Sequence, residues 1–139
     1  MPCRAAEWRV IMVKGIEHVA IFAKDTKALC DWYVNMFDLK VVYDNGKGTY
    51  FAAFESGDMI EFCMQTESGS DFGDKTGGIR HLALSVTEDG FDKMVEKLKN
   101  AGVEIVSDVS VSSKGIKTFF FRDIESNISH LIYRPQPLV

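Results

Sequence analysis

The stretch GIEHVAI at residues 15–21 returns, with its pattern kept, as GIRHLAL at residues 78–84. A second match pairs MIEF at residues 59–62 with ISHL at residues 128–131. Similarity that recurs at a near-constant shift is typical of a chain built from two copies of one structural unit. The pattern of apolar residues inside each copy therefore indicates the fold.

The first copy reads as a strand, a helix and three strands. Alternating apolar residues predict a strand at 16–22. Asp25 and Thr26 then form an N-cap signal, and apolar residues from Leu29 to Phe37 recur at helical spacing. Three more strands are predicted at residues 39–43, 49–54 and 59–64, separated by turn signals.

The second copy repeats this order. A strand is predicted at 79–86, and a helix has an apolar stripe from Phe91 to Leu98, with Gly102 as its C-cap. Further strands are predicted at residues 103–106, 117–122 and 128–133, and residues 109–114 read as a polar loop. Both copies are thus βαβββ modules, which predicts an α+β protein.

Turn-rich and repeat-free stretches set the predicted boundaries. Each module has about 55 residues, too few to bury a strong core alone, so the two must pack together, within the chain or across a dimer. We expect one domain, made of an N-terminal extension (1–12), a first module (13–64), a linker (65–77), a second module (78–134) and a tail (135–139).

Composition excludes several classes of protein. The 139 residues carry a net charge of −4, which argues against nucleic acid or an anionic membrane as the partner. The sequence contains nothing close to the roughly 18 consecutive apolar residues of a membrane span. Three widely spaced cysteines form no disulfide framework, which predicts a cytoplasmic location.

All three histidines fall at positions that the repeat makes equivalent to another polar residue. His18 matches His81, and His130 matches Glu61 in an otherwise apolar strand. Because side chains alternate across a strand, His18 and His81 share a face with small alanines. The opposite, apolar face is expected to pack against the helix. The sequence therefore predicts one metal site formed by His18, Glu61, His81 and His130.

Three imidazoles and one carboxylate suit a borderline divalent ion: zinc, nickel, iron, cobalt or manganese. Such an ion polarises a carbonyl group or stabilises an enediolate. Lys114 and Lys117 are candidates to meet an anionic substrate, although two solvated lysines are the simpler interpretation. The sequence predicts no other substrate-binding residue.

The repeated phrases, the helix end at residues 32–39 and the segment 121–131 resemble the vicinal oxygen chelate superfamily. It includes glyoxalase I, methylmalonyl-CoA epimerase, fosfomycin and bleomycin resistance proteins and extradiol dioxygenases. The resemblance, from about Val13 to Arg134, implies a cupped, partly open barrel around a divalent metal. It also implies a homodimer that shares its sites, acting on a small molecule.

Within that family the glyoxalase branch is the expected one. The resemblance implies a lyase, isomerase or epimerase that stabilises an enediolate of a small carbonyl substrate, with Glu61 as the catalytic base. Two departures leave alternatives open: His130 replaces the usual glutamate, and residues 123–127 read Asp-Ile-Glu-Ser-Asn in place of Asp-Pro-Asp-Gly-Asn. The alternatives are an iron-dependent dioxygenase and a non-catalytic binding protein of the resistance type.

Overall fold

The structure is a computed structural model that describes residues 16–65, 79 and 81–139. The predicted extension 1–12, and the predicted linker apart from Gln65, lie outside the described residues. Both modules have the predicted order of elements. The bounds are β1 (His18–Ala23), α1 (Thr26–Phe37), β2 (Lys40–Asp44), β3 (Tyr50–Ala53), β4 (Met59–Met64), β5 (Leu82–Ser85), α2 (Glu88–Asn100), β6 (Glu104–Val111), β7 (Lys117–Arg122) and β8 (Ile128–Tyr133).

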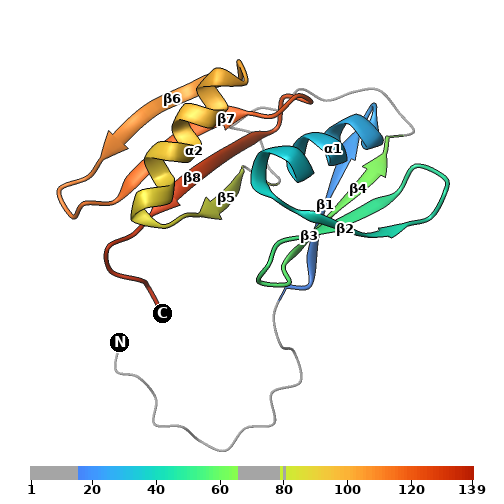
Figure 1. The fold of residues 1–139 in the computed structure, drawn as a ribbon, viewed down its shortest axis with the longest axis horizontal. Helices are drawn as coiled ribbons and strands as arrows, with labels where there is room; N and C mark the ends of the chain where they lie inside the picture. The colour runs from blue at the N-terminus through green and yellow to red at the C-terminus, as the bar shows by residue number, and fades with distance from the viewer. Residues whose placement is uncertain (1–15, 66–78, 80) are drawn as a thin grey trace, which may run out of the picture.

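Each module builds one four-stranded sheet with the same topology. The strand orders are β1-β4-β3-β2 and β5-β8-β7-β6, and the two sheets stand beside each other in Figure 1. The first strand of each module runs parallel to its last strand, while the other neighbours are antiparallel. The prediction of an α+β fold from two βαβββ modules is confirmed. The two sheets do not close into a barrel, which is consistent with the predicted cupped, partly open shape.

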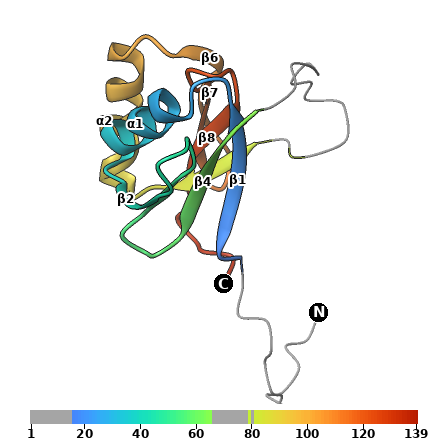
Figure 2. The same ribbon diagram turned by 90° about the vertical axis from the view of Figure 1, so that its right-hand side faces the viewer.

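Both helices lie on the same side of the sheets, as the side view in Figure 2 shows. Asp25 caps α1 by accepting a hydrogen bond from the backbone N–H of Ala28 at 3.0 Å, as its N-cap signal predicts. Gly102, with φ of +76°, ends α2 in the left-handed region that glycine adopts at low cost. Neither described helix is long and apolar enough to cross a membrane.

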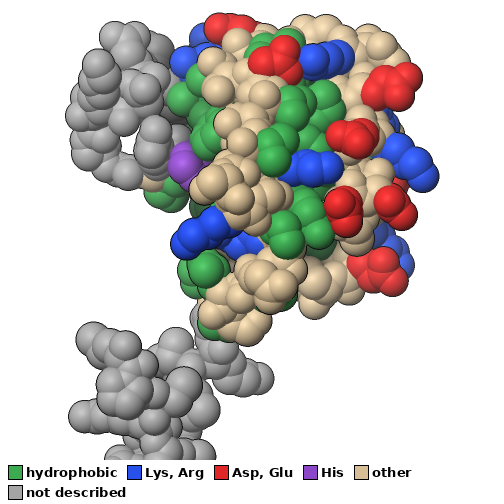
Figure 3. All heavy atoms as spheres, turned by 90° about the vertical axis from the view of Figure 1, so that its left-hand side faces the viewer, with side chains coloured by type: hydrophobic (Ala, Val, Ile, Leu, Met, Phe, Trp, Pro, Cys, Tyr) green, Lys and Arg blue, Asp and Glu red, His purple; other side chains and the backbone are tan. Residues whose placement is uncertain are grey.

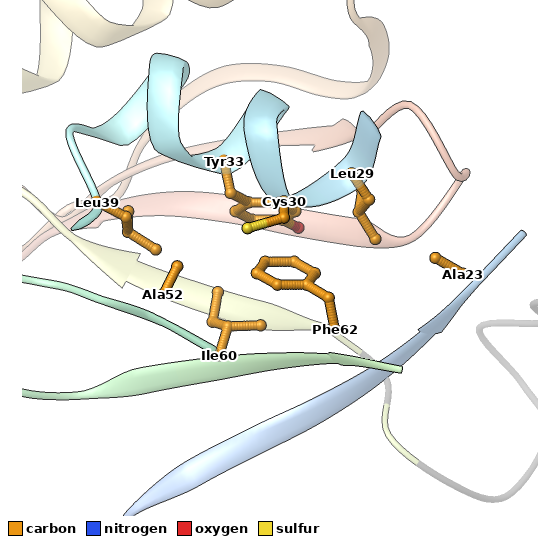
Figure 4. Close-up of a cluster of buried hydrophobic side chains, with 8 residues drawn as sticks. All are labelled: Ala23, Leu29, Cys30, Tyr33, Leu39, Ala52, Ile60 and Phe62. Atoms are coloured by element: carbon orange, nitrogen blue, oxygen red, sulfur yellow. The ribbon is translucent and has the colours of Figure 1, made fainter. Parts of the chain in front are cut away.

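The cores lie between each helix and its sheet. In the first module, Figure 4 shows Tyr33 and Leu29 of α1 facing Phe62 and Ile60 of β4. Full burial of a side chain such as Phe62 stabilises the fold by about 1.5–3 kcal/mol. Trp32 packs against this cluster and also against the second cluster, so the two cores are joined through α1.

Residues of the second module hold α1 at its middle. The Tyr33 hydroxyl, fully buried, donates a hydrogen bond of 2.8 Å to Asp123 Oδ2 and lies 3.3 Å from Ser129 Oγ. Asp123 also accepts hydrogen bonds from the backbone N–H of Glu125 and of Asn127 and from the Asn127 amide. These donors compensate the cost of burying the carboxylate. Burial, with the nearby Asp123 charge, raises the Tyr33 pKa well above its usual value.

The second module also holds both ends of α1. Glu125 Oε1 accepts hydrogen bonds from the backbone N–H of Lys24 (2.6 Å) and Asp25 (3.0 Å), just before the helix starts. In the last turn of α1, the carbonyl oxygens of Asn35 (3.0 Å) and Met36 (2.8 Å) accept hydrogen bonds from Lys97 Nζ. These charges complement the helix dipole, and α1 itself has no acidic residue in its first turn and no basic residue in its last. The two modules are therefore firmly connected.

The largest departure from the predicted elements is at β6. The strand expected at 103–106 runs on as β6 to Val111, so the predicted polar loop 109–114 is partly strand. β6 is an edge strand whose eight residues are all exposed, so polar side chains there do not oppose strand formation. Figure 3 shows hydrophobic side chains exposed on the side of the molecule where β6 lies. Ile105, Val106, Val109 and Val111 are the exposed apolar residues of this strand.

Candidate metal centre

The strand registers place two of the candidate ligands, Glu61 and His130, equivalently. Glu61 pairs with Ala20 on β1, and His130 pairs with Ala83 on β5. Directly paired residues point to the same face of a sheet. Their neighbours along β4 and β8, such as Phe62 and Leu131, are buried against the helices. The candidates therefore lie on the faces that the helices leave uncovered.

In the first module, His18 and Glu61 form a polar pair. His18 Nε2 lies 3.3 Å from Glu61 Oε2, and the other ring nitrogen, Nδ1, lies 3.0 Å from Glu17 Oε1. The ring of Phe51 meets His18 edge to face at 5.1 Å between centroids. The side chains of His18 and Glu61 are 35% and 21% exposed, so both reach solvent.

Cys63 supports the second oxygen of this carboxylate. Its thiol donates to Glu61 Oε1 at 3.1 Å, from the next residue on the same face of β4. Burial, followed by the hydrogen bond and the charge of Glu61, raises the Cys63 pKa to about 11. At neutral pH the thiol is therefore protonated, which makes it a donor and a poor nucleophile.

In the second module, His81 and His130 form an aromatic pair. Their ring centroids lie 4.5 Å apart at an angle of 86°, and Phe120 stacks on His130 at 4.1 Å with nearly parallel rings. The same Phe120 ring meets His81 edge to face at 5.6 Å. His130 is only 5% exposed, so it is more deeply buried than His18 or Glu61.

The four candidates come together two by two. Among the described residues, no group of three or more His, Cys, Asp or Glu side chains is arranged to hold a metal ion. Imidazole nitrogens and a carboxylate oxygen are suitable donors for zinc and its neighbours, which take three or four protein ligands. The donor chemistry thus fits a divalent metal, while each module of one chain supplies two donors.

Sequence reasoning missed the residues that surround the pairs. Phe51 and Phe120 occupy equivalent places, directly opposite Glu61 and His130, and the match of residues 49–51 with 118–120 could have identified them. Lys117, named as a candidate for an anion contact beside the simpler interpretation of a solvated lysine, has an aromatic neighbour. Its ammonium group stands 6.0 Å from the ring centre of Phe91 on α2, which is the helix side of the sheet.

Comparison with known proteins identifies the family of the chain. Residues 15–127 match the model of the Glyoxalase/Bleomycin resistance protein/Dioxygenase superfamily. The fosfomycin resistance protein FosX of Listeria innocua is 23% identical over 124 residues, covering 86% of this chain and 90% of that protein. The metallothiol transferase FosB of Lysinibacillus sphaericus is 24% identical over 111 residues, covering 80% and 76%.

A solved structure shows the same fold. The glyoxylase/bleomycin resistance protein/dioxygenase domain from Frankia sp. aligns with a TM-score of 0.75 and 24% identity, over 89% of this chain and 94% of that domain. The chain belongs to the glyoxalase/bleomycin resistance protein/dioxygenase superfamily. The predicted resemblance is therefore confirmed, and it covers most of the chain.

Proposed function

We propose that this protein is a divalent-metal-dependent enzyme of the glyoxalase branch, a lyase, isomerase or epimerase acting on a small carbonyl compound with adjacent oxygens. The observation that supports the proposal is that His18 lies beside Glu61 and His81 beside His130, two pairs at positions that the repeat makes equivalent. A divalent metal bound there would hold the substrate oxygens and stabilise an enediolate.

Glu61 is the proposed base. It is the carboxylate among the four candidate ligands, and its two oxygens face different partners, the Cys63 thiol and the His18 ring. A carboxylate held in this way moves a proton between neighbouring carbon atoms of a bound substrate. A histidine bound to metal is a poor base, because its free electron pair is engaged.

We propose that a homodimer completes the site, with His18 and Glu61 from one chain facing the partner's second-module pair. The contacts of Tyr33, Asp123 and Lys97 support this, because they fix the two modules of one chain relative to each other. Each module then presents its own pair of ligands, and a second chain would supply the missing pair. In a two-fold dimer each chain would give one pair to each of two identical sites. A cytoplasmic location, predicted from the cysteines, is part of the same proposal.

Metal content tests the ligand set. Protein purified without a polyhistidine tag should bind zinc or nickel, and His130→Ala should lose it. His130→Phe is the matched control for folding, because it keeps a flat ring on Phe120 but has no nitrogen donor. Wild-type protein that binds none of zinc, nickel, iron, cobalt or manganese would contradict the proposal and favour a non-catalytic binding protein.

Mixed dimers test whether the site is shared. A His18→Ala chain and a His130→Phe chain should each fail to bind metal alone. When the two chains are co-expressed, metal binding should return at one site of each mixed dimer. That site receives the intact first-module pair of the His130→Phe chain and the intact second-module pair of the His18→Ala chain. Persistent failure of the mixture, with mixed dimers present, would place all four ligands within one chain or reject the set.

Turnover tests the reaction. With metal bound, Glu61→Gln should lower kcat by about 10²–10⁴-fold on any substrate that the wild type isomerises or cleaves. The screen includes fosfomycin, since the FosX relative carries fosfomycin resistance in its name. Oxygen consumption with Fe(II) would instead support the iron-dependent dioxygenase, using His18, His81 and Glu61. Full turnover by Glu61→Gln would reject Glu61 as the base.

A further inference from the structure

The contacts around His18 select which ring nitrogen faces Glu61. Glu17 Oε1 lies 3.0 Å from Nδ1, and Glu61 Oε2 lies 3.3 Å from Nε2. A neutral imidazole has one N–H donor and one nitrogen with a free electron pair. Only one of the two carboxylates can therefore accept a hydrogen bond from the neutral ring.

The position of that N–H decides whether the pair can bind a cation. With the hydrogen on Nδ1, the electron pair of Nε2 and the oxygen of Glu61 point into the same space, as two ligands of one metal ion would. With the hydrogen on Nε2, the ring donates to Glu61 instead, and both groups are engaged with each other. Cys63 already donates to Oε1 of the same carboxylate, which reduces its need for a second donor.

We infer that Glu17 is a positioning residue for His18: it accepts the Nδ1 hydrogen and so keeps Nε2 as the metal-binding atom. This rests on the proposed metal site. Metal-bound histidines generally donate their other ring N–H to a carboxylate, a carbonyl or water, which orients the ring and raises its basicity. Glu17 itself does not touch the metal.

Arg80, the residue before His81, cannot play this role in the second module. The repeat places Arg80 at the position of Glu17, and a guanidinium group can only donate hydrogen bonds. The Glu17 side chain is 75% exposed, so its replacement leaves the core intact. An effect of Glu17 substitution on His18 would therefore report the contact between the two side chains.

Nitrogen-15 NMR of the metal-free protein, at a pH where the rings are neutral, tests the inference directly. The two tautomers give different ring-nitrogen shifts, and His18→Ala identifies the signals of His18 among three histidines. Wild type should carry the hydrogen on Nδ1, and Glu17→Ala should move the population toward Nε2. Glu17→Gln, which keeps a neutral acceptor oxygen, should fall between them. Glu55→Gln is the matched control, because Glu55 is also an exposed glutamate, and it should leave the tautomer of His18 unchanged.

Zinc affinity, measured by competition with a chelator, is the second readout. Glu17→Ala should bind zinc about tenfold more weakly, the lower end for such partners because Glu17 is exposed. A wild-type His18 with its hydrogen on Nε2, or a tautomer that ignores Glu17→Ala, would overturn the inference. The expected tautomers in a wild type that binds no metal would instead reject the proposed function, and the metal role of Glu17 with it.

Discussion

The two pairs of candidate ligands occupy equivalent places but have different surroundings. His18 and Glu61 are partly exposed and bounded by polar groups, the Glu17 carboxylate and the Cys63 thiol. His81 and His130 pack against each other and against Phe120. The repeat thus preserves where a ligand stands, while the neighbours determine its chemistry. We expect the first pair to move protons and the second to provide a rigid anchor.

The turns before the last strand of each module show the same divergence. In the first module Phe54 N–H bonds the Asp58 carbonyl oxygen at 2.9 Å, and in the second Asp123 N–H bonds that of Asn127 at the same distance. The backbones match, yet Phe54 packs against its own core while Asp123 bonds to Tyr33 of the other module. The second turn has therefore become a connection between modules.

The largest expected effect separates the two pairs by stability. In the presence of a chelator, His130→Ala should lower the free energy of unfolding by about 3 kcal/mol, because it leaves a cavity beside the Phe120 ring. His18→Ala should cost less than about 1 kcal/mol, since His18 is partly exposed. Urea unfolding of both variants measures the difference. Equal losses would mean that the pairs do not differ in packing.

A smaller effect tests the connection between modules. Tyr33→Phe should cost about 1.5 kcal/mol, because the buried Asp123 carboxylate loses a donor. Tyr133→Phe is the matched control, as that hydroxyl meets Glu88 at an exposed site. Urea unfolding at pH 8 compares the two, and a Tyr33→Phe variant as stable as the control would contradict the role of this hydrogen bond.

The same tyrosine predicts a pH dependence. Because the folded-state pKa of Tyr33 is raised above its ordinary value, its contribution to stability is present below about pH 10 and is lost as the pH rises toward the folded-state pKa. Unfolding of wild type should therefore become easier between pH 8 and 10.5 by more than unfolding of Tyr33→Phe does. Parallel pH profiles of the two proteins would be the contrary result.

The smallest effect compares the two turns reciprocally. Ser126 has φ of +69° and Gly57, at the equivalent position, has φ of +96°, a region that costs a non-glycine residue energy. Ser126→Gly should stabilise the protein by about 0.5–1 kcal/mol, and Gly57→Ser should destabilise it by about 1 kcal/mol. Thermal unfolding of both variants measures the two changes in stability. Changes of the same sign would contradict the prediction and show that the two turns differ in backbone strain.

The sequence predicted the elements well because their signals are local. The Asp25 cap, the helix ending at Gly102 and the alternation around His18 follow from neighbouring residues alone. The error at β6 has the same origin, since an edge strand needs no apolar face and its polar residues read as a loop. Ser126 takes the left-handed conformation of this turn without being glycine, and the hydrogen bond from Asp123 N–H to the Asn127 carbonyl oxygen closes the turn.

By itself the sequence determined the βαβββ repeat, the family and the four candidate ligands. A sequence repeat shows which residues occupy equivalent positions in the two modules, however the modules pack. Only the tertiary structure decided which groups meet: Glu17 at one nitrogen of His18 and Glu61 at the other, Phe120 on His130, and Asp123 on Tyr33. Most of these partners are 10 to 90 residues apart along the chain, and even Glu17, next to His18, depends on how its side chain turns. Such a contact depends on how distant segments pack together, and the local pattern of apolar residues does not predict it.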